Sequence, residues 1–389
     1  MRVLFVQFAN SMFPRFGVSD GYWDAFYSTY ADYGYVRMED AFEVPKWIAE
    51  ACYFLPEGSE RKICWVHHST IEAVDEIRTG GYDFVLFSVM TCTKGFTEEI
   101  IQMTNPSQQF VIGGYDKWIY EAAKRFKNVH TADTMQESAT LMGLSYKAGT
   151  DYSLFNGWTV LPRLTLSYGC LNNCKFCIVP HTTSVVVDAV IEQQVDSFRD
   201  LNFKLIYIDD KTFGQARNFR IIGQLRERIL EYNKDFIGFV VQTTTGMLVR
   251  RAQEFKDLGV VVAEIGLETY NDSILKLYRK PSSERMIRKS IETAGEKGVK
   301  IIPNLIVGIP EETEVTYTRT KNFIAGNAEN LFGVNFAMYT DYSSPDCVGE
   351  VDFAASNKVA LHRQFWRELN QLATDKILDR NKITNNTAL

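Results

Sequence analysis

Short apolar runs alternate with amphipathic stretches along most of this 389-residue chain, and this alternation constrains the fold more than any other feature. In the first part of the chain, each apolar run ends in polar residues or glycine, as buried strands do. The stretches between the runs repeat apolar residues at helical spacing. Strand, helix, strand in regular order predicts a parallel sheet covered by helices, because parallel neighbours need a crossover connection.

We therefore expect residues 1–147 to form an open, doubly wound, Rossmann-like α/β sheet. A second series of longer repeats begins near Leu161. Its six βα repeats favour a partial (β/α)6 TIM-type barrel over residues 148–345, with the active site at the C-terminal ends of the strands. Residues 346–389 would form a C-terminal helical extension and tail. The expected strands are 2–8, 62–68, 84–90, 108–114, 163–169, 204–210, 236–244, 260–268, 300–308 and 332–340, and the expected helices are 43–55, 70–80, 96–104, 187–201, 219–232, 248–259, 283–298 and 313–326.

Composition narrows the class of protein. Hydrophobic residues make up 46% of the chain and charged residues 23%, which is typical of a soluble globular protein. No apolar run approaches the roughly 18 residues that a membrane span needs, and no export-type cleavage region follows the first apolar run, so we expect a cytoplasmic protein without a membrane partner. The net charge of −6 offers no global field for a polyanion, so nucleic acid is not favoured.

Three of the seven cysteines, Cys170, Cys174 and Cys177, lie within eight positions, on the loop after the first strand of the second series. An odd number of cysteines without a signal peptide argues against a disulfide framework and for bound metal. Three thiolates can converge on one metal centre, yet they leave a four-iron cube one ligand short. One iron would then stay open to an exchangeable ligand. The alternative is structural zinc, with His181 as the fourth ligand.

Cys-x3-Cys-x-Phe-Cys directly after the first strand of a βα barrel resembles the radical S-adenosylmethionine superfamily, with Phe176 at its usual aromatic position. Residues 236–323 also resemble the barrel half of the branch that carries an N-terminal cobalamin-binding domain. The motifs that carry this likeness are, in order, FKDLGVVVAEIGLET, NDSILKLYRK, a helix ending in EKGVKI, and LIVGIPEETEVTYTRTKNFI. With the α/β domain upstream, the likeness extends from residue 1 to about residue 340.

The resemblance implies roles for individual residues. The three clustered cysteines would bind a [4Fe–4S] cluster, whose fourth iron chelates the amino and carboxylate groups of S-adenosylmethionine. Asp209 and Asp210 stand where the superfamily contacts the methionine amino group, and a carboxylate suits that place because it accepts charge-assisted hydrogen bonds. Glu268 matches the family's strand-four glutamate, and Gly308 matches the glycine that lets adenosine approach the backbone. For each acid the alternative is a solvated strand end or a helix cap.

The resemblance also implies the chemistry. An electron from the reduced cluster cleaves the sulfonium and gives a 5′-deoxyadenosyl radical that abstracts a hydrogen atom from the substrate. A flavodoxin- or ferredoxin-type partner would donate the electron. Ser88, Gly113 and Gly114 lie at strand ends where the family accommodates cobalamin, although no Asp-x-His-x-x-Gly motif is present. The alternative for this first domain is a related fold kept for docking or for binding substrate.

The function predicted from these motifs is cobalamin-dependent C-methylation of an unactivated carbon in a small-molecule or peptide substrate. A cobalamin-free radical rearrangement is one alternative. A methylthiotransferase is another, suggested by GCLNNCKFCIVP, although Cys52, Cys64 and Cys92 do not match the spacing of that family's three-cysteine auxiliary site. The alternative from another class is a non-catalytic iron–sulfur or zinc protein.

Two further features are candidates for contacts with substrate or partner. Cys347, just after the sixth strand of the second series, is a candidate for donating a hydrogen atom or touching substrate, with a bystander thiol as the alternative. Residues 276–289 carry six basic residues and one acidic residue. This segment would meet a phosphate group or a reductase, or would simply be a solvated helix face.

Overall fold

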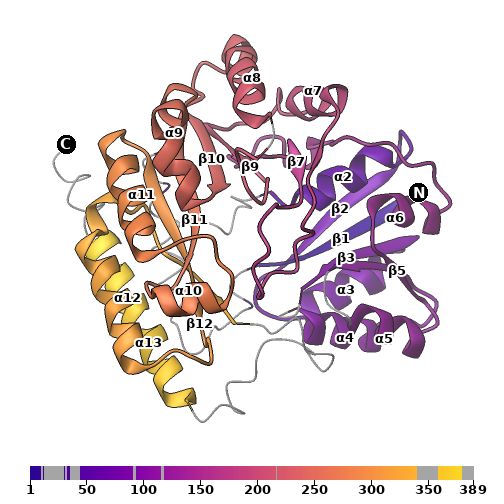
Figure 1. The fold of residues 1–389 in the computed structure, drawn as a ribbon. Coiled ribbons are helices and arrows are strands. Elements are labelled where there is room, and N and C mark those ends of the chain that lie inside the picture. The colour runs from indigo at the N-terminus through magenta and orange to yellow at the C-terminus, as the bar shows by residue number, and fades with distance from the viewer. Residues whose placement is uncertain are drawn as a thin grey trace, which may run out of the picture.

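The computed structural model describes residues 1–9, 12, 30, 33–35, 44–90, 93–114, 118–215, 217–339 and 358–378. Two parallel sheets lie side by side in it, each with helices on its outer side (Figure 1). Cys347 and Cys92 fall outside the described residues, so their predicted roles stay predictions. None of the described helices has the length and apolar character needed to cross a membrane.

The first sheet has five parallel strands in the order β2-β1-β3-β4-β5, which confirms the predicted doubly wound architecture. A fifth strand and two helices follow the four strands expected from the sequence. The strands are β1 (Arg2–Phe8), β2 (Glu60–Val66), β3 (Phe84–Val89), β4 (Gln109–Gly114) and β5 (Val129–Ala132), and the helices are α2 (Lys46–Phe54), α3 (Ile71–Gly80), α4 (Lys94–Met103), α5 (Trp118–Arg125) and α6 (Met135–Leu141).

Alternate residues of each strand supply two separate cores. Leu4, Val6 and Phe8 of β1 pack with buried residues of α3, α4 and α5 on one side of the sheet. Val3 and Phe5 of the same strand face the other side, where they join the core that includes α2 and α6. This second core runs without interruption into the helices of the second sheet. The first sheet is therefore packed against the half-barrel through one of its faces.

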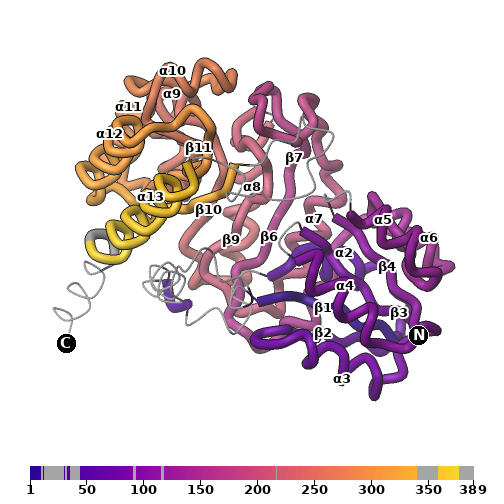
Figure 2. Tube along the Cα trace, turned by 90° about the horizontal axis from the view of Figure 1, so that it is seen from below, coloured from indigo at the N-terminus to yellow at the C-terminus, as the bar shows by residue number. Residues whose placement is uncertain are grey.

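The second sheet is a six-stranded parallel half-barrel in the order β13-β12-β11-β10-β9-β6, which confirms the predicted partial barrel. Helices α11, α12 and α13 lie along its outer side (Figures 1 and 2). The strands are β6 (Arg163–Leu164), β9 (Leu205–Ile208), β10 (Gly238–Thr243), β11 (Val260–Glu268), β12 (Lys300–Val307) and β13 (Asn335–Met338), and the helices are α7 (Asp188–Asp196), α8 (Asn218–Tyr232), α9 (Thr245–Asp257), α10 (Asp272–Leu277), α11 (Glu284–Glu296), α12 (Glu314–Gly326) and α13 (Val359–Leu372). A π-helical turn (Ala373–Leu378) follows α13, and 3-10 turns occupy Ser153–Phe155 and Ala328–Asn330.

The first strand of the half-barrel is shorter than the sequence predicts. The expected strand 163–169 divides into β6 and a separate strand β7 (Ser167–Tyr168), which pairs antiparallel with β8 (Ser184–Val185). The backbone amides of Leu166 and Ser167 donate to the Asp210 carboxylate instead of continuing the ladder with β9. The chain therefore leaves the half-barrel just before the cysteine loop.

An early segment of the chain closes the base of the half-barrel. Tyr30 and Tyr35 belong to the small core on the inner face, formed with residues of β9, β10, β11 and β12. The Tyr30 ring meets the ring of Phe332 edge to face, with 4.7 Å between centroids. The Tyr35 hydroxyl accepts hydrogen bonds from the amides of Leu205 and Lys204, at 3.0 and 3.2 Å. The inner face is therefore apolar and filled at its base.

Candidate active site

The loop that carries the three cysteines is held at both ends. Gly169 has a φ of +79°, and a Cβ there would lie 1.7 Å from the carbonyl oxygen of Thr182, so only glycine can enter the loop at this point. The amide of Cys170 donates to the Pro180 carbonyl at 2.9 Å, and the amide of Lys175 donates to the Tyr278 carbonyl at 3.0 Å. These contacts attach the loop to its own return strand and to the segment after α10.

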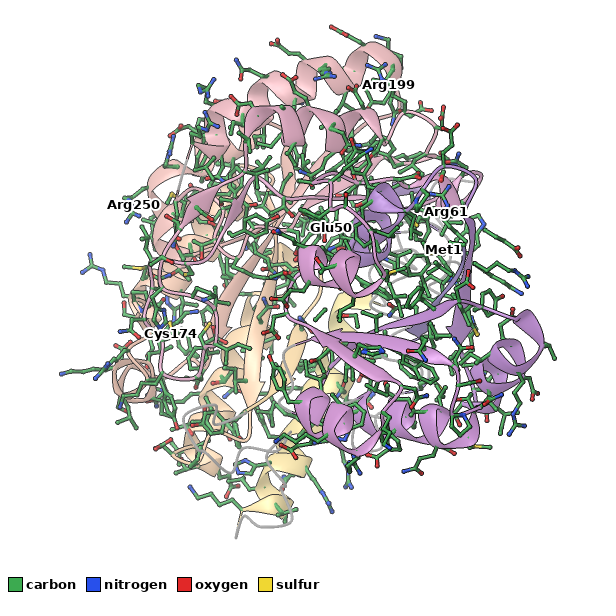
Figure 3. The ribbon with its side chains drawn as sticks, turned by 90° about the vertical axis from the view of Figure 1, so that its right-hand side faces the viewer. Met1, Glu50, Arg61, Cys174, Arg199 and Arg250 are labelled. Carbon is green, nitrogen blue, oxygen red and sulfur yellow. The ribbon has the colours of Figure 1, made fainter. Side chains whose placement is uncertain are left out.

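The three thiols of the loop are unbridged. None of them forms a disulfide. The sulfur of Cys170 lies 3.2 Å from the Thr212 hydroxyl and accepts from the amide of Asn172 at 3.4 Å. Burial raises the pKa of Cys174 to about 11, Lys280 opposes this shift, and Glu268 and the other two thiols add to it. Figure 3 shows Cys174 over the half-barrel, on the opposite side of the view from Arg61.

The donor set of this loop fits a three-cysteine iron–sulfur cluster in number and in chemical type. Among the described residues, no three His, Cys, Asp or Glu side chains already stand as a metal-binding group. Binding a cluster would therefore require the thiols to lose their protons and turn toward one another. His181, the candidate zinc ligand, places Nδ1 2.8 Å from the carbonyl oxygen of Asn172, which holds the ring against the cysteine loop.

Asp209 and Asp210 are adjacent in sequence but have different surroundings. Asp210 is fully buried, and its carboxylate accepts from Leu166 N at 2.8 Å, Ser167 N at 2.9 Å and Ser167 Oγ at 2.7 Å, and also from the side-chain amide of Asn218. Burial raises the pKa of Asp210 to about 6, although the hydrogen bonds from Ser167 and Leu166 act against this shift. This acid therefore joins the end of β9 to the turn that leads into the cysteine loop.

Asp209 faces positive charge. Its carboxylate lies 3.3 Å from the guanidinium of Arg163 and 3.6 Å from the ammonium of Lys211. Burial acts to raise its pKa, but Arg163, Lys211 and Lys46 outweigh burial and hold the pKa below its usual value. Both predicted acids are thus engaged with the protein, and only Asp209 is partly exposed. A contact of either acid with a methionine ammonium stays a prediction.

Glu268 ends β11 in an uncommon backbone conformation. Its φ is +63°, and its carboxylate pairs with the Lys280 ammonium at 2.6 Å. Lys280 also lies over the ring of Phe176, with 5.9 Å from Nζ to the centroid. The predicted Glu268 is therefore beside the cysteine loop. The sequence did not single out Lys280 among the six basic residues of segment 276–289. No local pattern marks it as the buried cation of that segment.

Gly308 is held from outside the half-barrel. Its φ is +97°, and its amide donates to the Tyr317 hydroxyl at 3.1 Å. That hydroxyl lies 2.6 Å from Nδ1 of His362, and the Tyr317 ring stacks on Phe365 with centroids 3.8 Å apart. Helices α12 and α13 together fix the loop that contains Gly308. The sequence offered no signal for the contribution of His362, since it depends on the docking of α13.

A polar row lies on the inner face above the apolar base. Gln242, Glu264 and Asn304 each follow an inner-core residue by two positions, so they point to the same face. The amide of Gln242 donates to Glu264 at 3.2 Å. The Oδ1 of Asn304 is buried, and none of the described residues donates to it. Strand alternation in the sequence is the signal that could have identified this row.

The predicted cobalamin residues lie at one corner of the first sheet. Ser88 and Gly113 are paired in register and share a face with Leu86 and Val111, which belong to the core that continues into the half-barrel. Gly114 has a φ of +142°, and a Cβ there would lie 1.9 Å from the carbonyl oxygen of Val89. Close contact between strands therefore already requires glycine at position 114, so that glycine by itself does not indicate a ligand.

The fold and the three-cysteine loop together define a class of protein. Residues 164–324, from β6 into α12, match the profile of the radical SAM superfamily. This part of the chain therefore belongs to that superfamily of enzymes, as the sequence motifs predicted, and membership implies a [4Fe–4S] cluster and S-adenosylmethionine.

Solved structures of cobalamin-dependent enzymes share the fold over most of the chain. OxsB, a cobalamin-dependent S-adenosylmethionine radical enzyme with aqua-cobalamin bound, gives a TM-score of 0.57 at 12% identity and covers 94% of this chain and 56% of its own. TsrM from Kitasatospora setae, a radical S-adenosylmethionine methyltransferase with cobalamin and a [4Fe–4S] cluster bound, gives 0.56 at 12% identity, with 87% and 74% covered. At such identities the likeness establishes the fold alone.

Relatives found by sequence similarity are named for a different reaction. A methylthiotransferase-like protein of Methanocaldococcus jannaschii is 29% identical over 170 residues, which is 40% of this chain and 37% of that protein. The ribosomal protein uS12 methylthiotransferase RimO of Bacteroides thetaiotaomicron is 25% identical over 175 residues, or 41% and 40% of the two chains. This chain therefore spans about two fifths of the length of these relatives.

We predict that Asp210→Ala lowers the free energy of unfolding by roughly 3 kcal/mol or more, because it leaves several buried donors without an acceptor. Asp209→Ala should cost about 1 kcal/mol, since a partly exposed ion pair contributes little. Urea-induced unfolding of the metal-free chain, followed by circular dichroism, measures both values. Equal losses in the two variants would contradict a structural role specific to Asp210.

A second prediction concerns the buried Oδ1 of Asn304. Asn304→Leu should raise the free energy of unfolding of the ligand-free chain by about 1 kcal/mol, because a buried acceptor without a donor is removed. Asn271→Leu is the matched control, since its Oδ1 caps α10 through the amides of Ser273 and Ile274. That control should lose about 1 kcal/mol. Thermal or urea unfolding would refute the prediction if both variants were destabilised alike.

Proposed function

We propose that this chain is a radical S-adenosylmethionine enzyme that methylates an unactivated carbon with the help of cobalamin. The observation that carries the proposal is the doubly anchored loop with three free thiols at the end of the half-barrel. The resemblance of the fold to cobalamin-dependent enzymes, over nearly the whole chain, supports the choice of cobalamin. When bound, the reduced cluster and S-adenosylmethionine supply a 5′-deoxyadenosyl radical that removes a hydrogen atom from the substrate.

The residues of this chain would bind, orient and exclude water. Cys170, Cys174 and Cys177 would hold the cluster, and a flavodoxin- or ferredoxin-type donor would deliver the electron. The filled base of the half-barrel leaves the opposite end as the place where substrate enters. Gln242, Glu264 and Asn304 would meet that substrate with acceptor oxygens, which suits a small molecule or peptide that presents N–H or O–H donors.

The second candidate function is methylthiotransfer, which the similar sequences favour. Methylthiotransferases hold an auxiliary cluster on three cysteines. In this chain, such a cluster would require three cysteines of the first domain to lie close together. Cys52 belongs to the core on one face of the first sheet, whereas Cys64 packs against the core on the other face. Cobalamin-dependent methylation is therefore the reaction we propose.

The corner of the first sheet that would receive cobalamin carries small and polar residues. Ser88 and Gly113 present the smallest side chains of their strands at the C-terminal edge, where open α/β sheets receive ligands. Gln7 of β1 shares this face, because it follows Phe5 by two positions, and it accepts a hydrogen bond from the indole of Trp47 at 3.1 Å. This row combines small residues with polar groups next to the half-barrel, which favours a cofactor that carries hydrogen-bonding groups over an apolar one.

The first test of the function is metal content. Anaerobic reconstitution should give about four irons per chain, and alanine at Cys170, Cys174 and Cys177 together should abolish both the iron and the formation of 5′-deoxyadenosine under dithionite. Cys64→Ala, which removes a thiol far from the loop, should keep both. Normal iron in the triple variant would refute the cluster assignment, and zinc in place of iron after anaerobic isolation would favour the structural alternative.

The second test is retention of cobalamin. The wild-type chain should carry hydroxocobalamin through gel filtration, and Ser88→Trp should lose it, because the indole would fill the corner beside Gly113. Gln102→Trp, on the exposed side of α4, should still retain the corrinoid, and both variants should keep about four irons. Elution of the wild-type chain without corrinoid would leave the first sheet as a docking element and favour a cobalamin-free reaction.

A further inference from the structure

The basic segment 276–289 divides in the structure into paired and unpaired charges. Lys280 is turned inward and pairs with Glu268 at 2.6 Å, and the single acid of the segment, Glu284, pairs with Arg319 at 2.7 Å. The remaining cations therefore have no acid of this segment to neutralise them. No ion pair or side-chain hydrogen bond to another described residue involves the exposed side chains of Lys276, Arg279, Arg285 and Lys289.

Two of these cations lie beside the cysteine loop. The amide of Lys175, in the middle of that loop, donates to the Tyr278 carbonyl at 3.0 Å, and the Lys175 side chain is exposed. Tyr278 directly precedes Arg279 and follows Lys276 by two positions. Arg279 has a φ of +55° and is exposed, whereas the side chain of the next residue, Lys280, is only 15% exposed. The turn at Arg279 thus separates a cation that faces solvent from one that faces the protein interior.

Exposed apolar side chains accompany these cations. Leu171 and Ile178 directly follow cysteines of the loop, and they are 61% and 42% exposed. Leu277, next to Lys276, is 44% exposed. Exposed apolar side chains with a polar surround are typical of surfaces that bind another protein. We call this surface the outer patch, and its residues are Leu171, Lys175, Ile178, Lys276, Leu277 and Arg279.

The positive charge of the outer patch is local. The whole chain carries a net charge of −6, so an acidic protein is attracted only where cations gather without acidic partners. Such a cluster of cations directs an acidic protein to one place and one orientation. A free phosphate group suits the outer patch less well, because the side chains of Leu171, Ile178 and Leu277 offer it no hydrogen-bond donor.

We propose that the outer patch is the docking surface for an acidic protein that carries a single electron. The inference rests on the proposed function, which requires an electron at the cysteine loop. Leu171 and Ile178 belong to both the patch and the loop, so a protein docked there reaches the cysteines without entering the half-barrel. In the transfer the docked protein is oxidised by one electron, the cluster gains that electron, and no bond forms or breaks. A small patch of this kind suits the brief encounters of electron carriers.

The first test measures binding of a flavodoxin, an acidic one-electron carrier, by titration calorimetry on the reconstituted chain. The double variant Lys276→Glu/Arg279→Glu should weaken binding roughly 10-fold or more at low salt, because two attractions become repulsions. This loss should shrink at an ionic strength of about 0.15 M, where exposed charges are screened beyond about 8 Å. Leu277→Ser should weaken binding by the same factor at both salt concentrations, since an apolar contact is not screened.

The matched control is the double variant Lys127→Glu/Lys256→Glu. Both lysines are exposed, and they precede β5 and β11, so they lie at the N-terminal edges of the two sheets. The control changes the net charge by the same amount and should leave the affinity for flavodoxin within about twofold. Equal weakening by the two double variants would overturn the inference, because net charge would then explain the binding without the outer patch.

The second test separates delivery of the electron from the chemistry that follows. With reduced flavodoxin, Lys276→Glu/Arg279→Glu should form 5′-deoxyadenosine roughly 10-fold more slowly than the wild type. After full reduction by dithionite the two rates should agree, and both proteins should hold about four irons per chain. Cleavage by the wild type with dithionite, without binding of flavodoxin or use of its electron, would overturn the inference and leave the proposed function in place. Absence of cleavage with either reductant would overturn the proposed function.

Discussion

Four donors surround the buried carboxylate of Asp210, and this arrangement fixes where the cysteine loop begins. Two of the donors are backbone amides that would otherwise continue the first strand of the half-barrel. Because Asp210 takes them, the chain turns out of the sheet at Leu166, pairs briefly with its own return strand, and carries Cys170 to the end of the half-barrel. Burial of this acid, with its four donors, thus positions the site.

The interior of the half-barrel changes character from base to mouth. At the base, Tyr30, Tyr35 and Phe332 fill the space between the strands with apolar contacts. Two residues further along the strands, carboxylate and amide groups take over, and the pair of Lys280 and Glu268 lies beyond them. A buried polar group without a partner lowers stability, so a ligand that donates a hydrogen bond to Oδ1 of Asn304 would recover that cost. The apolar residues that stabilise the half-barrel therefore lie at its base, and the polar residues that could contact a ligand lie nearer the C-terminal ends of the strands.

The first sheet contributes to the site in two ways, through the residues at its C-terminal edge and through the face that packs against the half-barrel. One face joins the core of the half-barrel, which fixes the corner with Ser88 and Gly113 against the second sheet. The same packing separates Cys52 from Cys64, because α2 covers one face of the sheet while Cys64 contacts the core on the other. Strand alternation thus places Ser88 and Gly113 on the face that joins the half-barrel and keeps Cys64 on the opposite face. This arrangement favours a cofactor at the sheet corner over a cluster held by the cysteines of this domain.

The sequence by itself determined the two parallel sheets, most of their strands and helices, and the three cysteines, because these follow from local periodicity and from the spacing of residues in one loop. Glu268 and Gly308 were also accessible from motifs, and both have the positive φ that special positions require. Only the tertiary structure decided which of two adjacent acids is structural, since Asp209 and Asp210 differ in contacts made more than 40 residues away in sequence. It also decided that Lys280 is the buried cation of a basic segment and that His362 supports Gly308. Such contacts depend on how separate elements pack, and no local pattern records them.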